Sequence, residues 1–179
     1  WNSNAWGEDA YQRAFAQHWF GLTNNDPTSL RKLFHMENMK KSAPIQWANG
    51  AGAAWIYWTH FANLKKEAGI HWPQLVAAAP EMLSNSDEML KYLKHFKSSV
   101  KNNKVTLDAM ETTMQMYKCS AMKILAIEKA ADLYRQAEEI QSSDPVKASS
   151  LIDNSADTLA ELKKNLSYVT KGLEQARDE

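Results

Sequence analysis

The sequence predicts an all-α protein with two parts: a small aromatic-rich helical subdomain over residues 1–80 and a long antiparallel three-helix bundle over residues 81–179. Apolar residues recur at three- and four-residue spacing through most of the chain, which is the period of an amphipathic helix. All seven Trp residues lie between Trp1 and Trp72, so the composition changes sharply near residue 80. No segment alternates apolar and polar residues convincingly enough to indicate a strand.

The first predicted helix spans Glu8–Phe20. Glu8 and Asp9 fall in its first turn, where the helix dipole favours carboxylates. Gly21 supplies the C-terminal stop. The helical spacing is carried by Ala10, Tyr11, Ala14, Phe15 and Trp19.

A second predicted helix begins after the turn NNDPTS, with Asp26 as its cap and Pro27 in its first position, and runs to about Lys41. The segment SAPIQWANGAG then has the Pro and Gly punctuation of a loop.

The segment AAWIYWTHFANLKKEAG predicts one helix that is apolar on nearly every side and therefore buried within the domain. Trp55, Trp58 and His60 are expected to be core residues of this helix. Gly69 ends it, and Trp72-Pro73 begins a short further element.

The bundle follows in three helices. The first begins near Ser84 or Asp87 and ends at Val100, and the polar turn KNNK leads to a very long helix over about 106–140. The sequence SSDP breaks this helix, with Asp144 as cap and Pro145 in the first turn of the next one. Short polar connections make neighbouring helices antiparallel.

Two stripes of apolar residues predict the two long helices of the bundle. On the second bundle helix the stripe consists of Leu107, Met110, Met114, Tyr117, Ala121 and Ile124, and after a phase shift near Glu128 it continues through Ala131, Tyr134 and Ala137. The last helix has an unbroken 4-3 seam: Ile152, Ser155, Leu159, Leu162, Leu166, Val169, Leu173 and Ala176. Met110, Met114, Met116 and Met122 are either core filling or an adaptable surface for a partner, and core filling is the commoner role.

Composition narrows the functions. The 21 basic and 21 acidic residues give a net charge of zero, which removes the usual electrostatic driving force for nucleic-acid binding. Cys119 is the only cysteine, so neither an intramolecular disulfide nor a thiolate-rich metal site can form. No apolar run reaches the ~20 residues that span a bilayer.

The chain begins with a Trp inside an apolar stretch. This start favours a segment that continues from a preceding domain, and removal of a signal peptide is the alternative.

Motifs for catalysis are missing from the sequence. The five histidines, at positions 18, 35, 60, 71 and 95, form no HExxH or Glu-x-x-His pattern, and no phosphate loop or GxSxG elbow occurs. We therefore predict no catalytic residue, no metal ligand and no cofactor in this chain. The remaining candidates are exposed indoles that could stack on a sugar ring: Trp1, Trp6 and above all Trp47, in its Gly- and Asn-containing loop.

The opening WNSNAWGEDAYQRAFAQHWFG resembles the region that follows the catalytic (β/α)8 barrel in O-GlcNAcase-like and α-glucuronidase-like glycoside hydrolases. The resemblance covers about the first 21 residues and rests on Trp1-Asn2, Trp6, Tyr11, Phe15 and Trp19-Phe20-Gly21. It implies that the catalytic carboxylates lie upstream of Trp1 and that Asn2 contacts hydroxyls of a bound sugar. Ser3 stands where that family often has Pro.

These observations predict a non-catalytic helical domain of a carbohydrate-active enzyme that braces the catalytic domain, walls the substrate cleft or mediates self-association. Its expected partner is the preceding catalytic domain of the same polypeptide; a bound glycan and a homodimer through the bundle stay open. The expected location is periplasmic or secreted. The alternative is a free-standing periplasmic helical-bundle sensor or protein-interaction module, and an enzyme complete in this chain is a third possibility.

Overall fold

The computed structural model describes residues 7–22 and 56–178, with the side chains of Glu8, Asp9 and residues 168–178 left out of the description. All regular elements in these residues are helices. They are α1 (Glu8–Phe20), α5 (Phe61–Ala68), the 3-10 helix η1 (Gly69–His71), α6 (Trp72–Ser99), α7 (Lys104–Ile140) and α8 (Pro145–Asp178). The helix predicted after Asp26, the loop that contains Trp47, and Trp1, Asn2, Trp6 and Trp55 lie outside the described residues.

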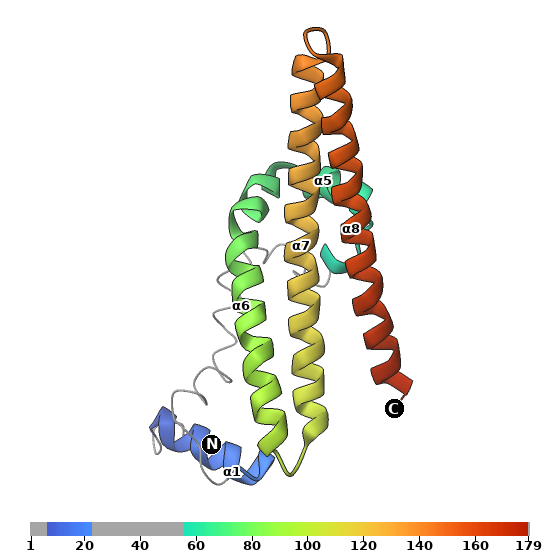
Figure 1. Cartoon of the computed structure of the whole chain (residues 1–179). Helices are drawn as coiled ribbons and strands as arrows, with labels where there is room; N and C mark the ends of the chain where they lie inside the picture. The colour runs from blue at the N-terminus through green and yellow to red at the C-terminus, as the bar shows by residue number, and fades with distance from the viewer. Residues whose placement is uncertain (1–6, 23–55, 179) are drawn as a thin grey trace.

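Helix α7 is the centre of the bundle. It packs along α6 on one side and along α8 on the other, and consecutive helices run antiparallel (Figure 1). The upper ends of α7 and α8 extend past the start of α6 as a two-helix hairpin, and α1 lies across the lower end of α6 (Figure 1). The predicted all-α fold with a long antiparallel three-helix bundle is confirmed.

Two apolar clusters hold the helices together, and both lie between α6 and α7. The lower one joins α1 to the α6–α7 hairpin, and the upper one joins α5 and Ile56 to it. The lower cluster contains Ala16, Phe20, Leu22, Met89, Leu93, Phe96, Val100, Leu107 and Met114. The upper cluster contains Ile56, Leu64, Ala68, Trp72, Leu75, Ala79, Met82, Ala121, Ile124 and Ile127.

Helix α6 is longer than the sequence indicated. The prediction of a short element at Trp72 and a separate helix from Ser84 or Asp87 is wrong, because one helix runs from Trp72 to Ser99. Pro73 lies in the first turn, where its missing N–H has no cost. Pro80 lies inside the helix, where it removes a backbone hydrogen bond, but burial of Ala79 and Met82 on either side keeps the helix continuous.

The predicted boundary between residues 80 and 81 therefore falls within α6. The division of the chain into two domains stays a prediction. No described helix is long and apolar enough to cross a lipid bilayer.

The predicted single helix before Gly69 is also corrected. Residues 56–58 are helical, the chain bends at Thr59, and α5 starts at Phe61 with His60 as its N-cap. The His60 side chain accepts a hydrogen bond from the Ala62 amide at 3.3 Å, so it is an exposed capping residue and not a core histidine. Trp58, expected in the core, is 75% exposed. Gly69 ends α5 as predicted.

The break between α7 and α8 agrees with the sequence. Helix α7 ends at Ile140, a turn follows, and Asp144 caps α8 by accepting a hydrogen bond from the Lys147 amide at 3.0 Å. Pro145 is the first residue of α8.

The two predicted stripes are only partly buried. On α7, Leu107, Met114, Ala121 and Ile124 are buried, but past the phase shift Tyr134 is 50% exposed. On α8, Ser155 and Leu162 are buried, whereas Ile152 is 43% exposed. Both exceptions lie in the hairpin that projects past α6, where each helix has one neighbour and not two. Met110, Met116 and Met122 are half-buried.

Candidate functional site

Helix α1 is fixed to the lower end of the bundle by one face. Ala16 and Phe20 are 0% and 2% exposed, and Leu22 continues this contact beyond the helix. They pack in the same cluster as Leu93 and Phe96 of α6. The aliphatic and aromatic area removed from water at this contact holds α1 against the bundle.

The C-terminal end of α1 is held by the turn between α6 and α7. The backbone amides of Lys101 and Asn102 donate to the carbonyl oxygen of Phe20 at 3.0 and 3.3 Å. The side-chain amide of Asn103 donates to the carbonyl oxygen of Trp19 at 2.8 Å. These bonds satisfy carbonyls that a helix end leaves without intrahelical partners. Gly21 makes the close approach possible by adopting a left-handed conformation with φ of 69°.

Another face of α1 carries three aromatic rings, Tyr11, Phe15 and Trp19, which we call the aromatic strip. Successive ring centroids are 6.2 and 5.8 Å apart, and Phe15 stacks on Trp19 with an interplanar angle of 17°. Phe15 also meets Phe20 edge-to-face, which links the strip to the core. Tyr11 and Trp19 remain 42% and 44% exposed.

The aromatic strip combines a backbone fixed to the bundle with two aromatic rings, those of Tyr11 and Trp19, that are partly exposed to solvent. Aromatic side chains lose little conformational entropy on binding and are enriched at the centres of interfaces. The strip is therefore the best candidate in the described chain for a docking surface. The helical spacing of these residues predicted α1, but spacing alone did not separate them from the buried residues Gln12, Ala16 and Phe20.

A second candidate site is the side chain of Lys123, a buried residue that is 4% exposed. Its Nζ donates to the carbonyl oxygens of Ile56, Tyr57 and Thr59 at 2.9, 2.7 and 2.6 Å. These carbonyls belong to the end of the helical turn at residues 56–58, where a helix dipole favours a cation. Burial lowers the pKa of Lys123. With all three of its donors engaged, the ammonium is a structural clamp between α7 and the bend before α5.

Glu128 forms a second clamp about one turn further along α7. Its Oε2 accepts hydrogen bonds from Lys65 Nζ at 2.8 Å and from Trp72 Nε1 at 2.6 Å. Lys65 also lies over the Trp72 ring, with its Nζ 5.6 Å from the centroid. The hydrogen bonds from Lys65 and Trp72 lower the pKa of Glu128. These three side chains join α5, α6 and α7.

The only cysteine is a poor nucleophile. Cys119 is 1% exposed, and burial raises the pKa of its thiol to about 11. Among the residues that the structure describes, no group of three His, Cys, Asp or Glu side chains could hold a metal ion.

The proposed sugar contacts Asn2, Trp1, Trp6 and Trp47 lie outside the described residues, so the structure does not place them. Comparison with known proteins gives no relative: no family model, no curated protein and no solved structure matches this chain. The class of protein is thus defined by the fold alone, as a long helical bundle with an aromatic helix across one end.

Proposed function

We propose that this chain is a non-catalytic helical domain of a carbohydrate-active enzyme, secreted or periplasmic, in which α1 docks on the catalytic domain and the bundle holds α1 rigid. The observation that carries the proposal is the aromatic strip: Trp19 and Tyr11 stay half-exposed on a helix whose buried face, at Ala16 and Phe20, is fully engaged. A helix anchored on one side and apolar on another is suited to a second contact.

The likeness of the first 21 residues to the post-barrel region of large glycoside hydrolases supports the choice of partner. In that likeness the helix α1 directly follows the barrel, so its exposed rings would face the domain from which it emerges. A stacked Phe15–Trp19 pair offers a preformed surface, because the two rings restrict each other before the partner arrives.

Two measurements test the proposal. The purified chain is expected to show no turnover of chromogenic glycosides, and hydrolysis at an ordinary enzymatic rate would sink the non-catalytic assignment. The reading frame upstream of Trp1 is expected to encode a barrel of ~250 residues. A signal peptide in its place would contradict the proposal and favour the interaction module.

The docking surface has its own test. With the upstream domain produced separately, Trp19→Ala in the helical chain should weaken their association by about tenfold or more, as for a buried interface aromatic. Trp58→Ala is the matched control, since Trp58 is a still more exposed indole away from α1. Equal effects of the two substitutions, or no effect of Trp19→Ala, would remove α1 from the interface.

A further inference from the structure

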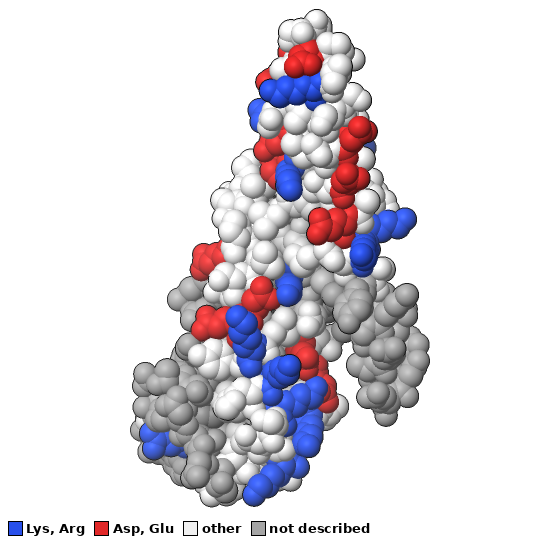
Figure 2. All heavy atoms as spheres, viewed as in Figure 1, with Lys and Arg blue, Asp and Glu red and all other residues white. Residues whose placement is uncertain are grey.

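The zero net charge of the chain conceals a separation of charge along the bundle. Residues 89–107 contain five Lys and no acidic residue, whereas residues 132–161 contain seven acidic and two basic residues, a net charge of −5. In Figure 2 Lys and Arg gather at the lower end of α6 and α7, and Asp and Glu form a column on the upper half of α8. Both groups appear on the same face of the molecule.

The lower group, which we call the basic end, consists of Lys91, Lys94, Lys101 and Lys104. All four are exposed, and no ion pair joins them to another side chain in the described part of the chain. Lys97, between them, differs: it is paired with Asp108 and Glu111 of α7 at 2.5 and 3.0 Å. The nearby carboxylates are thus already used, and the basic end keeps its charge.

The upper group contains an acidic stripe of Asp153, Asp157 and Glu161. These residues stand four apart on α8 and are exposed, and none forms an ion pair within the described residues. Like charges at this spacing repel one another and destabilise a helix in isolation. An external cation group would offset that repulsion.

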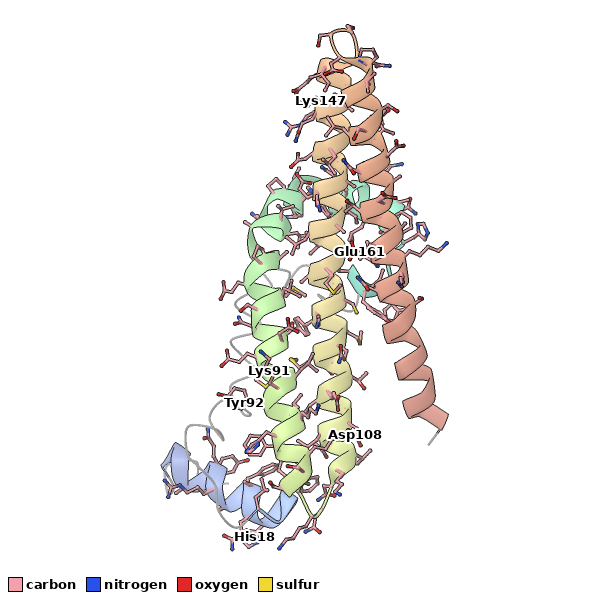
Figure 3. The ribbon with its side chains drawn as sticks, in the orientation of Figure 1. His18, Lys91, Tyr92, Asp108, Lys147 and Glu161 are labelled. Carbon is pink, nitrogen blue, oxygen red and sulfur yellow. The ribbon has the colours of Figure 1, made fainter. Side chains whose placement is uncertain are left out.

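The two groups form no ion pair with each other in the described part of the chain, and their outer members are far apart. Ser155 donates to the Ala130 carbonyl at 2.9 Å, which places the acidic stripe beside that part of α7. From Lys104 to Ala130 the helix rises roughly 40 Å, several times the Debye length of ~8 Å at physiological salt. In Figure 3 Lys91 lies on the lower half of α6 and Glu161 about midway along α8.

We propose that two copies of this chain associate antiparallel, with the basic end of each against the acidic stripe of the other. A two-fold axis perpendicular to the bundle forms both contacts at once, because an isologous interface repeats every contact. Exposed apolar residues accompany both groups and give each contact something to bury: Val105 is 73% exposed beside Lys104, and Ile152 is 43% exposed beside Asp153. This dimer uses a charged face of the bundle and does not depend on the proposed docking of α1.

The test uses charge reversal in the whole 179-residue chain. One variant carries Lys91→Glu, Lys94→Glu, Lys101→Glu and Lys104→Glu, and the other carries Asp153→Lys, Asp157→Lys and Glu161→Lys. Sedimentation velocity should show a dimer for the wild type at low ionic strength. Each variant alone should be monomeric, because its two ends then carry the same sign, and an equimolar mixture should restore the dimer. Lys66→Glu, an exposed reversal on α5, should leave the wild-type dimer intact.

Two further readouts fix the geometry. A carbodiimide, which joins only carboxylates and amines in contact, should link the four lysines to the acidic stripe between isotopically light and heavy copies. The dimer should dissociate at about 0.5 M salt, where screening shortens the range of the interaction to a few Å. A wild type that stays monomeric at low salt, variants that still dimerise alone, or growth into open chains would each overturn the proposal. Far-ultraviolet circular dichroism confirms that each variant is folded.

Discussion

The side-chain amide of Asn103, in the turn between α6 and α7, donates a 2.8 Å hydrogen bond to the carbonyl oxygen of Trp19, 84 residues earlier in the chain. Asn103 adopts a left-handed backbone conformation with φ of 53°, which directs the turn toward the end of α1. One residue thus reverses the chain and ties α1, with its aromatic strip, to the bundle.

Substitution of Asn103 separates these two roles. Asn103→Ala should lower the free energy of unfolding by about 1–2 kcal/mol, since it loses the hydrogen bond and strains the left-handed backbone. Asn103→Gly loses the hydrogen bond, but Gly tolerates the left-handed backbone conformation, so this variant should lose clearly less free energy of unfolding. Urea denaturation measures both, and a larger loss for Gly than for Ala would contradict this account.

Gly21 is a second conformational requirement at the same contact. An added Cβ would lie 3.1 Å from Lys101 Cβ and 3.2 Å from Asn102 Nδ2, at a φ of 69°. We expect Gly21→Ala to destabilise the protein by about 1–2 kcal/mol. Gly7→Ala is the control, because nothing lies within 4 Å of its Cβ position. Thermal unfolding should show a lower melting temperature for the first variant only.

Lys123 should contribute more to the free energy of unfolding than any exposed lysine. Lys123→Met keeps the length of the side chain but leaves the carbonyls of Ile56, Tyr57 and Thr59 without their shared donor. Loss of charge-assisted bonds at a buried site predicts a cost of about 2–4 kcal/mol. The exposed Lys129→Met should change the free energy of unfolding by less than ~0.5 kcal/mol. Equal effects in urea denaturation would show that the clamp contributes nothing.

Glu128 gives stability a dependence on acidic pH. Its pKa in the folded protein lies below the ordinary 4.5 because of Lys65 and then Trp72. Its contribution is therefore complete above pH 4.5 and disappears as the pH falls through the lower, folded-state pKa. The wild type should exceed Glu128→Gln in unfolding free energy by up to ~1 kcal/mol at neutral pH, with Lys65 well exposed. The difference should shrink in strong acid, and a constant difference would contradict the assignment.

Cys119 reports on unfolding. Because burial raises the pKa of its thiol to about 11 and leaves the residue 1% exposed, a disulfide reagent at mildly alkaline pH should react with it only after the bundle opens. The labelling rate should rise with urea in parallel with the loss of helical circular dichroism. Rapid labelling of the native protein would show that the α6–α7 contact opens locally.

Helix ends with strong local chemistry were predictable from the sequence. Glu8–Phe20 with Gly21, and the Asp144-Pro145 start of α8, agree with the structure because a cap or stop residue acts on its own neighbours. The long α7 was predicted for a similar reason: its apolar residues repeat at helical spacing from Leu107 to Ala137, with one phase shift near Glu128.

The errors arose where distant residues decided the outcome. Local spacing indicated a short element at Trp72 and a separate helix from Ser84 or Asp87, but the packing of Ala79 and Met82 keeps α6 whole through Pro80. The apolar run around Trp58 indicated one buried helix. The helix instead ends near Trp58, and Lys123, 64 residues after Thr59, donates a hydrogen bond to the carbonyl oxygen of Thr59. The aromatic strip could be found as a helix face, yet the sequence did not say which face the bundle would cover.

By itself, the sequence determined that this chain forms long antiparallel helices and where most of them start and stop, because helical period and capping act over a few neighbouring residues. Only the tertiary structure decided which rings of α1 remain in solvent, why the chain bends before α5, and how opposite charges come to lie at different heights of the bundle. Those features depend on contacts between residues tens of positions apart, which local spacing does not encode.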